Sequence, residues 1–252
     1  MVNVRIATVL EGILNGLSDL VYPPNCLLCK KYCGLRSPVD FLCPHCFNSI
    51  QFNLPPFCLK CSRPLGGSFQ YPKCRECRLK KTFFDFAWGA CLYHEPLRQL
   101  IHLFKYDQKT FLRFPFHKLL VNFIETYHFD IAQFDTLVPI PLYSARLRER
   151  GYNQSEIIAG GIAQKFNLGI SSHNLIRMRP TPSQTILSQK ERWTNLEGAF
   201  RIKHSKEFHN KNVLIIDDLL TTGATASEAA CVLKLAGAKT VGVLTLAIAS
   251  LE

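Results

Sequence analysis

The sequence lacks any run of apolar residues long enough to cross a membrane. A membrane-spanning helix needs about 20 consecutive apolar residues, and Glu11 and Asp19 interrupt the apolar pattern of residues 4–20. The start of the chain also lacks a basic segment beyond Arg5 and the small-residue cleavage site of a secretory signal. We therefore expect a cytoplasmic protein whose amphipathic helix, residues 1–21, packs on a core or binds a partner or a membrane surface.

Acidic residues are scarce relative to basic ones, with 19 Asp and Glu against 30 Lys and Arg. The resulting net charge of +11 and the pI of about 9.2 favour a polyanionic partner such as nucleic acid. Hydrophobic residues make up 47% of the 252 positions, a content typical of a globular chain with one or two domains rather than of a disordered one.

Cysteine, in contrast, is abundant. In a chain without a secretory signal, eleven cysteines indicate metal binding rather than disulfides. Eight of them form four Cys-x-x-Cys pairs, at 26/29, 43/46, 58/61 and 74/77. Two such pairs supply the four thiolates that structural Zn²⁺ prefers, with no open coordination position for catalysis.

The simplest assignment gives each zinc ion two consecutive pairs. One ion takes Cys26, Cys29, Cys43 and Cys46, and the second takes Cys58, Cys61, Cys74 and Cys77. An interleaved pairing stays open, as does iron–sulfur ligation, and Cys33 or His45 could replace a ligand of the first site. Proline and glycine turns separate the pairs, so we expect a small zinc-ribbon module over residues 22–80.

Residues 81–252 alternate between strand and helix patterns, which predicts an α/β fold with a doubly wound parallel sheet. Pro115 interrupts the helical pattern of residues 96–128, so two helices are expected there. The expected strands and helices lie at residues 82–94, 96–128, 137–142, 153–166, 213–216, 226–235 and 240–249.

The most informative segment is Val213–Thr225. A buried strand is followed by Asp217 and Asp218, and then by small and hydroxyl residues that lead into a helix. Such a turn can present backbone N–H groups and a helix N-terminus to a phosphate, while the carboxylates suit sugar hydroxyls or Mg²⁺. The pattern indicates a sugar phosphate as the ligand.

Two further segments carry candidate ligand residues. Arg146, Arg148 and Arg150 precede a helix at the end of the strand at residues 137–142, and could bind pyrophosphate or form a solvated basic face. Gln184 and Arg192 lie in a polar, proline-interrupted stretch, which suggests either a loop that orders over a ligand or a disordered insertion.

Val213–Thr225 resembles the signature of type I phosphoribosyltransferases. The resemblance implies that Asp217 and Asp218 hold the ribose hydroxyls of Mg²⁺-bound phosphoribosyl pyrophosphate. It also implies that the loop binds the 5′-phosphate through Thr221, Thr222, Gly223, Ala224 and Thr225. Arg146, Arg148 and Arg150 would then be the catalytic residues that stabilise the departing pyrophosphate.

Nearly the whole chain resembles the ComF family of competence proteins, which includes the GntX-like proteins. The resemblance rests on Leu103–Tyr106, Pro139–Pro141, Arg148–Gln154 and Arg179–Gln184, together with the cysteine pairs and the signature. It implies a bacterial protein that handles incoming single-stranded DNA in natural transformation, with other DNA-uptake proteins as partners and peripheral inner-membrane association left open. The alternatives are an active phosphoribosyltransferase of nucleotide metabolism and a sensor of phosphoribosyl pyrophosphate without chemistry.

Overall fold

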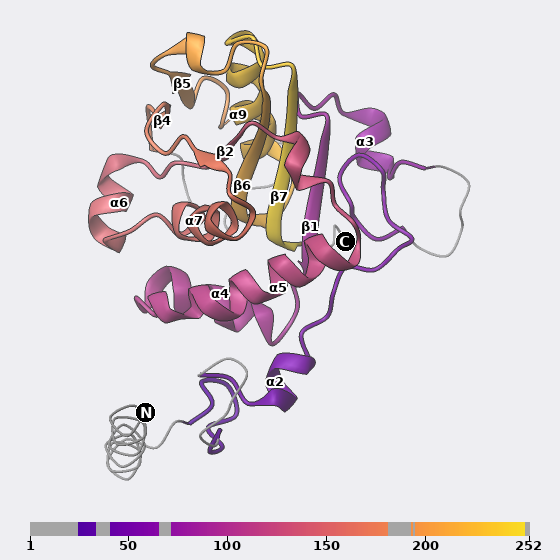
Figure 1. Cartoon of the computed structure of the whole chain (residues 1–252), viewed down its shortest axis with the longest axis vertical. Coiled ribbons are helices and arrows are strands. Elements are labelled where there is room, and N and C mark those ends of the chain that lie inside the picture. Colours follow the sequence, from indigo (N-terminus) through magenta and orange to yellow (C-terminus); the bar gives the residue numbers. More distant parts are fainter. Residues whose placement is uncertain (1–24, 34–40, 66–71, 181–192, 194, 250–252) are drawn as a thin grey trace, which may run out of the picture. The chain divides into compact units, whose positions relative to one another are not determined.

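The structure is a computed structural model that describes residues 25–33, 41–65, 72–180, 193 and 195–249 (Figure 1). It divides into two compact units, Met1–Ile50 and Gln51–Glu252. The first four cysteines of the paired set lie in the first unit, and the second four lie in the same unit as the sheet. This division differs from the predicted boundary after residue 80, and the predicted helix at residues 1–21 lies outside the described residues.

The described part of the first unit is a short cysteine-bearing segment. An isolated antiparallel bridge joins Asn25 to Tyr32, and helix α2 spans Pro44–Asn48. The Cys43 side chain caps α2 by accepting a hydrogen bond from the Cys46 backbone N–H. Proline at the first helical position suits this start, because that N–H has no intrahelical partner.

The second unit is built on a five-stranded parallel sheet of order β1-β7-β6-β2-β3. The strands are β1 (Phe86–Leu92), β2 (Thr136–Pro139), β3 (Gly169–Ile170), β6 (Asn212–Leu220) and β7 (Thr240–Ile248). The central strands β6 and β7 are almost continuously apolar, as strands covered on both faces are.

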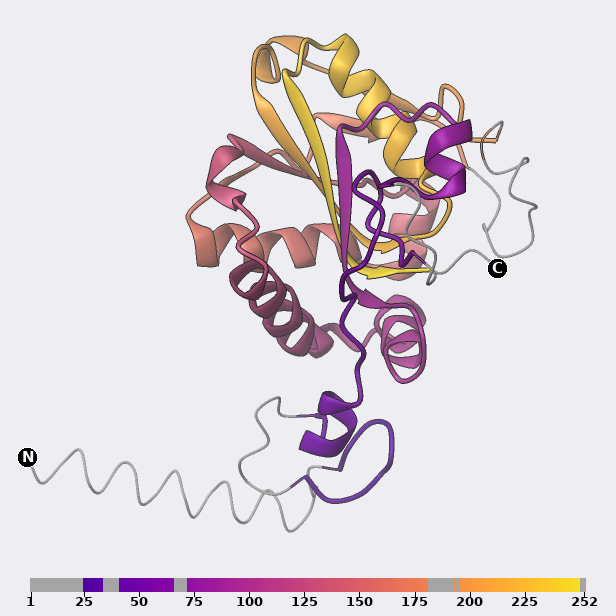
Figure 2. The same cartoon turned by 90° about the vertical axis from the view of Figure 1, so that its right-hand side faces the viewer.

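Helices cover both faces of this sheet, as Figure 2 shows. Helix α9 (Ala224–Leu235) packs against β6 and β7 on one face, and α5 (Arg113–Thr126) and α7 (Gln154–Phe166) lie on the other. The predicted α/β class, with a doubly wound parallel sheet preceded by a cysteine-rich segment, is confirmed.

Two helices fill the predicted helical stretch, but they do not divide at Pro115. Helix α4 spans Leu97–Tyr106 and buries the predicted apolar face, whereas α5 begins at Arg113 and holds Pro115 in its first turn. Proline is tolerated there because the first backbone N–H groups of a helix have no partner within the helix. A short 3₁₀ turn at Thr110–Leu112 separates the two helices.

Smaller elements complete the second unit. Strands β4 (Leu175–Arg177) and β5 (Phe200–Ile202) form an antiparallel pair. The remaining helical segments are α3 (Arg75–Leu79), α6 (Ser144–Arg150) and 3₁₀ turns at Ile131–Gln133 and Ser205–Glu207. Among the helices that the structure describes, none is long and apolar enough to cross a membrane.

Candidate ligand site and cysteine clusters

The candidate ligand site lies where β6 continues beyond its neighbour β2. The pairing of β2 with β6 ends at Pro139 and Ile216, while β7 accompanies β6 as far as Leu220. The two aspartates of the signature therefore lie inside β6, at the carboxyl end of the shorter strand beside it. Ligands of open α/β sheets bind at such strand ends.

A cavity of about 1030 Å³ opens at this point of the sheet. Its lining brings together three predicted groups: the acidic pair, part of the signature loop and two of the three arginines. These residues are Asp217, Asp218, Thr221, Gly223, Thr225, Arg146 and Arg150. The volume is at the upper end of the roughly 300–1,000 Å³ that small-molecule sites occupy.

The two carboxylates occupy different electrostatic environments. Asp218 is only 3% exposed and forms an ion pair with Lys105 of α4, and its Oδ1 accepts a hydrogen bond of 3.4 Å from Gln154. Asp217 accepts a bond of 2.8 Å from the Ser155 hydroxyl. Burial, together with the adjacent negative charge of Asp218, raises the pKa of Asp217 to about 7.

Lys105 and Gln154 are site residues whose roles the sequence interpretation missed. Burial disfavours the charge on Lys105, but the Asp218 carboxylate outweighs it and raises the pKa of Lys105 above its ordinary value. Gln154 also accepts a bond of 2.6 Å from Arg150. The signal for Gln154 was a polar residue at the first position of a helix whose centre, residues 157–163, is apolar. For Lys105 the signal was a cation beside the buried face of α4.

The signature loop enters α9 through Gly223, which is the N-cap and has a φ of 83°. That left-handed conformation is what favours glycine here, because a Cβ would make only an ordinary contact of 3.6 Å with the Phe84 ring. The Thr222 hydroxyl accepts a bond of 3.4 Å from Ala224 N–H. Five residues of the loop were predicted to bind the phosphate. Thr221, Gly223 and Thr225 line the cavity, whereas Thr222 and Ala224 do not.

The three arginines lie on helix α6 rather than on a loop before a helix. Residues four apart share one face of a helix, and the residue between them points elsewhere. Arg146 and Arg150 accordingly line the cavity, whereas Arg148 does not; both Arg146 and Arg148 are exposed. Arg150 is buried at 8% exposure and lies over the Tyr106 ring, 5.2 Å from its centroid.

The last residue of β4, Arg177, also lines the cavity. The electrostatic neighbours of Arg177 include Asp217 and Arg146. Gln184 and Arg192, which were predicted to bind the ligand, lie outside the described residues.

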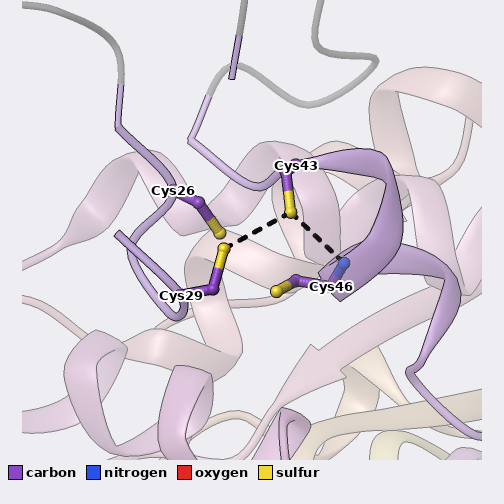
Figure 3. A group of neighbouring side chains, drawn as sticks. All are labelled: Cys26, Cys29, Cys43 and Cys46. Carbon is purple, nitrogen blue, oxygen red and sulfur yellow. Dashed lines mark hydrogen bonds between the residues drawn. The ribbon is translucent and has the colours of Figure 1, made fainter. Parts of the chain in front are cut away.

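The paired cysteines form two separate clusters. Cys26, Cys29, Cys43 and Cys46 form the first cluster, in which the sulfurs are turned toward one another (Figure 3). Cys58, Cys61, Cys74 and Cys77 form the second. The grouping is sequential rather than interleaved, and neither Cys33 nor His45 belongs to it.

The geometry of both clusters fits tetrahedral zinc. All ligand sulfurs of a cluster lie within 4.8 Å of one another, and the sulfur–sulfur distance is 3.7 Å for Cys29–Cys43 and 3.6 Å for Cys61–Cys74. A zinc ion with bonds of about 2.3 Å to four sulfurs separates them by about 3.8 Å. The donor sets therefore fit two structural zinc ions, each closed to further ligands.

Comparison with known proteins agrees with these clusters. Residues 17–78 match the model of the double zinc ribbon domain. The chain is 27% identical to "Competence protein F" of Haemophilus influenzae over 82% of this chain and 97% of that protein. It is also 27% identical to "Competence protein ComFC" of Bacillus subtilis, over 88% and 93% of the two chains. The chain is a homologue of the ComF-type competence proteins.

Other relatives of the chain carry a different name. "DNA utilization protein YhgH" of Salmonella typhi is 28% identical over 89% of this chain and 96% of its own. Among solved structures, one titled as the allosteric regulatory enzyme of purine biosynthesis aligns with 52% of this chain and 24% of its own. Its TM-score of 0.34 and identity of 21% are too low to bear on fold or function.

Proposed function

We propose that the chain is a cytoplasmic competence protein that binds phosphoribosyl pyrophosphate, or a similar sugar phosphate, and handles incoming single-stranded DNA in natural transformation. One observation supports the choice of ligand most directly: a single cavity is lined by the acidic pair, by the loop at the start of α9 and by two arginines. The names of the relatives, competence and DNA utilization, support the biological role.

The chemistry of the lining suits the parts of such a ligand. Asp217 and Asp218 offer carboxylates to ribose hydroxyls and to the Mg²⁺ that accompanies pyrophosphate. The Thr221–Thr225 loop combines hydroxyl donors with the N-terminus of α9, which favours a phosphate. Arg146 and Arg150 supply guanidinium groups for the pyrophosphate oxygens.

The basic surface supports the nucleic-acid part of the proposal. The net charge is +11, and exposed Lys and Arg side chains cluster around the second cysteine cluster at positions 73, 75, 78, 80 and 81. Such groups bind the phosphates of a single strand without reading its sequence. The described aromatics near them differ in exposure: Phe84 is buried, Trp88 packs edge-on against Phe57 and Phe123, and Phe83 is exposed.

Isothermal titration with phosphoribosyl pyrophosphate, with and without Mg²⁺, tests the ligand. We expect Asp218→Asn to weaken binding at least about tenfold, because a charged hydrogen-bond partner contributes about 1.5–3 kcal/mol. Asp130→Asn, an exposed aspartate in the turn before β2, is the matched control and should leave affinity unchanged. Wild-type protein without affinity at millimolar Mg²⁺ would overturn the ligand assignment.

A salt series with single-stranded oligonucleotides tests the second partner. Affinity should fall steeply as salt rises and depend little on sequence, because phosphate contacts release counterions. Competition by phosphoribosyl pyrophosphate would mean that one groove serves both ligands, and additive binding would mean separate surfaces. A binding curve that does not respond to salt would contradict a phosphate-based interaction.

A second candidate function is an active phosphoribosyltransferase of nucleotide metabolism. The cavity extends along α4 to Gln99, His102 and Tyr106, which leaves space for an acceptor beside a bound sugar phosphate. In that reaction a nucleophile attacks C1 of the ribose and pyrophosphate leaves. Release of pyrophosphate with a nucleobase or an oligonucleotide would favour the enzyme, and tight binding without release would favour a sensor.

A further inference from the structure

Arg63 links the second cysteine cluster to the loop that lines the ligand cavity. It is 5% exposed, and its Nη1 donates to the Cys61 sulfur at 3.8 Å. Its Nη2 donates to the backbone carbonyl of Thr221, which lies 158 residues further along the chain. One buried guanidinium therefore binds a metal-ligating residue and the first residue of the signature loop.

Neighbouring contacts hold the same two segments together. The Cys58 N–H donates to the Arg63 carbonyl at 2.8 Å, which fixes the turn that carries Arg63. The buried Phe84 ring lies against Gly223, and the Lys60 ammonium donates to the Phe84 carbonyl. The space left between cluster and loop is about 10 Å³, which is at most the volume needed for one water.

The bond from Arg63 also determines which way the loop presents its backbone. A trans peptide group is planar, so its N–H points opposite to its C=O. Because the Thr221 carbonyl is turned toward Arg63, the N–H of Thr222 points away from Arg63. The partial negative charge of the carbonyl is thereby neutralised by a cation, which favours an anion at the loop.

The turn that carries Arg63 depends on its metal ion. Residues 58–65 contain no helix or strand of their own, and four thiolates at the contact distances of the cluster repel one another unless an ion neutralises them. Loss of zinc from this cluster would release Cys61, and with it one of the two groups that hold Arg63 in place. The first cluster belongs to the other compact unit.

We propose that Arg63 is a positioning residue for the Thr221–Thr225 loop, and that through it the second zinc site, but not the first, maintains the phosphate-binding part of the ligand cavity. The ligand named here rests on the function proposed above, whereas the ordering of the loop does not. The two are therefore tested by separate measurements.

Hydrogen–deuterium exchange of the full-length, zinc-loaded protein measures loop order without ligand. We expect Arg63→Gln to raise exchange in the peptide spanning Thr221–Thr225 by about tenfold, the effect of losing one charge-assisted hydrogen bond. Exchange in β7 should not change. Arg63→Lys keeps one donor and the charge, so it should restore part of the protection. Arg75→Gln, an exposed arginine of the same cysteine segment, is the matched control.

Titration with phosphoribosyl pyrophosphate adds the ligand measurement. Arg63→Gln should bind about tenfold more weakly while retaining the zinc content of the wild type. Cys58→Ser and Cys26→Ser should each lose one zinc ion, but only Cys58→Ser should raise exchange in the loop. If Cys58→Ser does not fold, the loop exchange of Arg63→Gln compared with that of Arg63→Lys is the test of the role of Arg63.

The outcomes separate the two proposals. Unchanged loop exchange in folded Arg63→Gln, or an equal rise in Cys26→Ser, would overturn the role of Arg63. If the wild type does not bind phosphoribosyl pyrophosphate but its loop exchange responds to Arg63→Gln, the proposed ligand fails and the link from zinc to loop stands.

Discussion

At the scale of single residues, the charges of the two carboxylates in the acidic pair are compensated to different degrees. Lys105 neutralises Asp218 within the protein, whereas the largest influences on Asp217 are burial and the charge of its neighbour. A cation or a hydroxyl-bearing ligand would relieve that repulsion. Binding of such a ligand at Asp217 is therefore electrostatically favourable.

The raised pKa of Asp217 predicts how stability depends on pH. Between its ordinary value of 3.8 and about 7, the folded protein holds this proton more tightly than the unfolded chain does. The free energy of unfolding therefore falls as pH rises through this window, by up to about 4 kcal/mol at about 1.36 kcal/mol per pKa unit.

Asp217→Asn should remove this contribution, because the amide stays neutral and its oxygen still accepts from Ser155. Urea unfolding at pH 5 and pH 8 measures the effect: the variant should be more stable than the wild type at pH 8 and nearly equal to it at pH 5. A stability difference that is the same at both pH values would contradict a raised pKa at this position.

At the scale of elements, helix α6 separates three arginines that look equivalent in the sequence. Arg146→Glu places a negative charge in the cavity and should weaken binding of phosphoribosyl pyrophosphate by tenfold or more, that is, by about 1.4 kcal/mol or more. Arg148→Glu makes the same change of charge on the exposed side of α6 and should leave this affinity unchanged. Calorimetry on both variants checks the prediction, and equal losses would mean that net charge rather than position determines binding.

The same helix illustrates what sequence patterns can and cannot predict. Hydrophobic periodicity located the sheet strands β1, β2, β6 and β7 and helices α4, α5, α7 and α9, because burial of an apolar face is a local signal. Five of the seven residues at Ser144–Arg150 are polar or charged, and the segment carries no such signal, so the helix there was missed. Pro115 was taken as a break because sequence alone does not reveal that α5 begins only two residues before it.

The candidate site was predictable where its residues are contiguous. The acidic pair and the loop follow one another in a single segment, and the spacing of the cysteine pairs identifies both clusters. Lys105 and Arg63 were not predicted as site residues. Their partners, Asp218 and Thr221, lie far along the chain, and only the fold brings each pair together. No local pattern distinguishes such a cation from a solvated one.

At the scale of the whole molecule, the two cysteine clusters belong to different compact units and should respond differently to loss of metal. We expect about two zinc ions per chain, from the two tetrahedral donor sets. Cys26→Ser should remove one ion and unfold the first unit locally, because metal binding and folding are coupled in such segments. The main unfolding transition of the sheet should keep its midpoint.

Elemental analysis and calorimetric unfolding of the reductively purified protein check both statements. Finding a single zinc ion in the wild type would mean that only one of the two clusters binds zinc. A lowered midpoint of the sheet transition in Cys26→Ser would mean that the first cluster also stabilises the second unit. Asn48→Ala, an exposed change at the end of α2, serves as the control for substitution in the first unit.

The position of β1 in the sheet has a consequence for how the protein is made. Within the sheet, the first strand pairs with the last one, from Phe86 with Gly242 to Leu92 with Ile248, and backbone hydrogen bonds also join it to the preceding segment at Gln51, Asn53 and Lys60. During synthesis, β1 therefore leaves the ribosome long before β7, its partner in the sheet, has been made, and the nascent chain carries a largely apolar strand without that partner until residues 240–248 emerge. A chain that stops before Thr240 leaves β1 without its partner in the sheet and prone to aggregation.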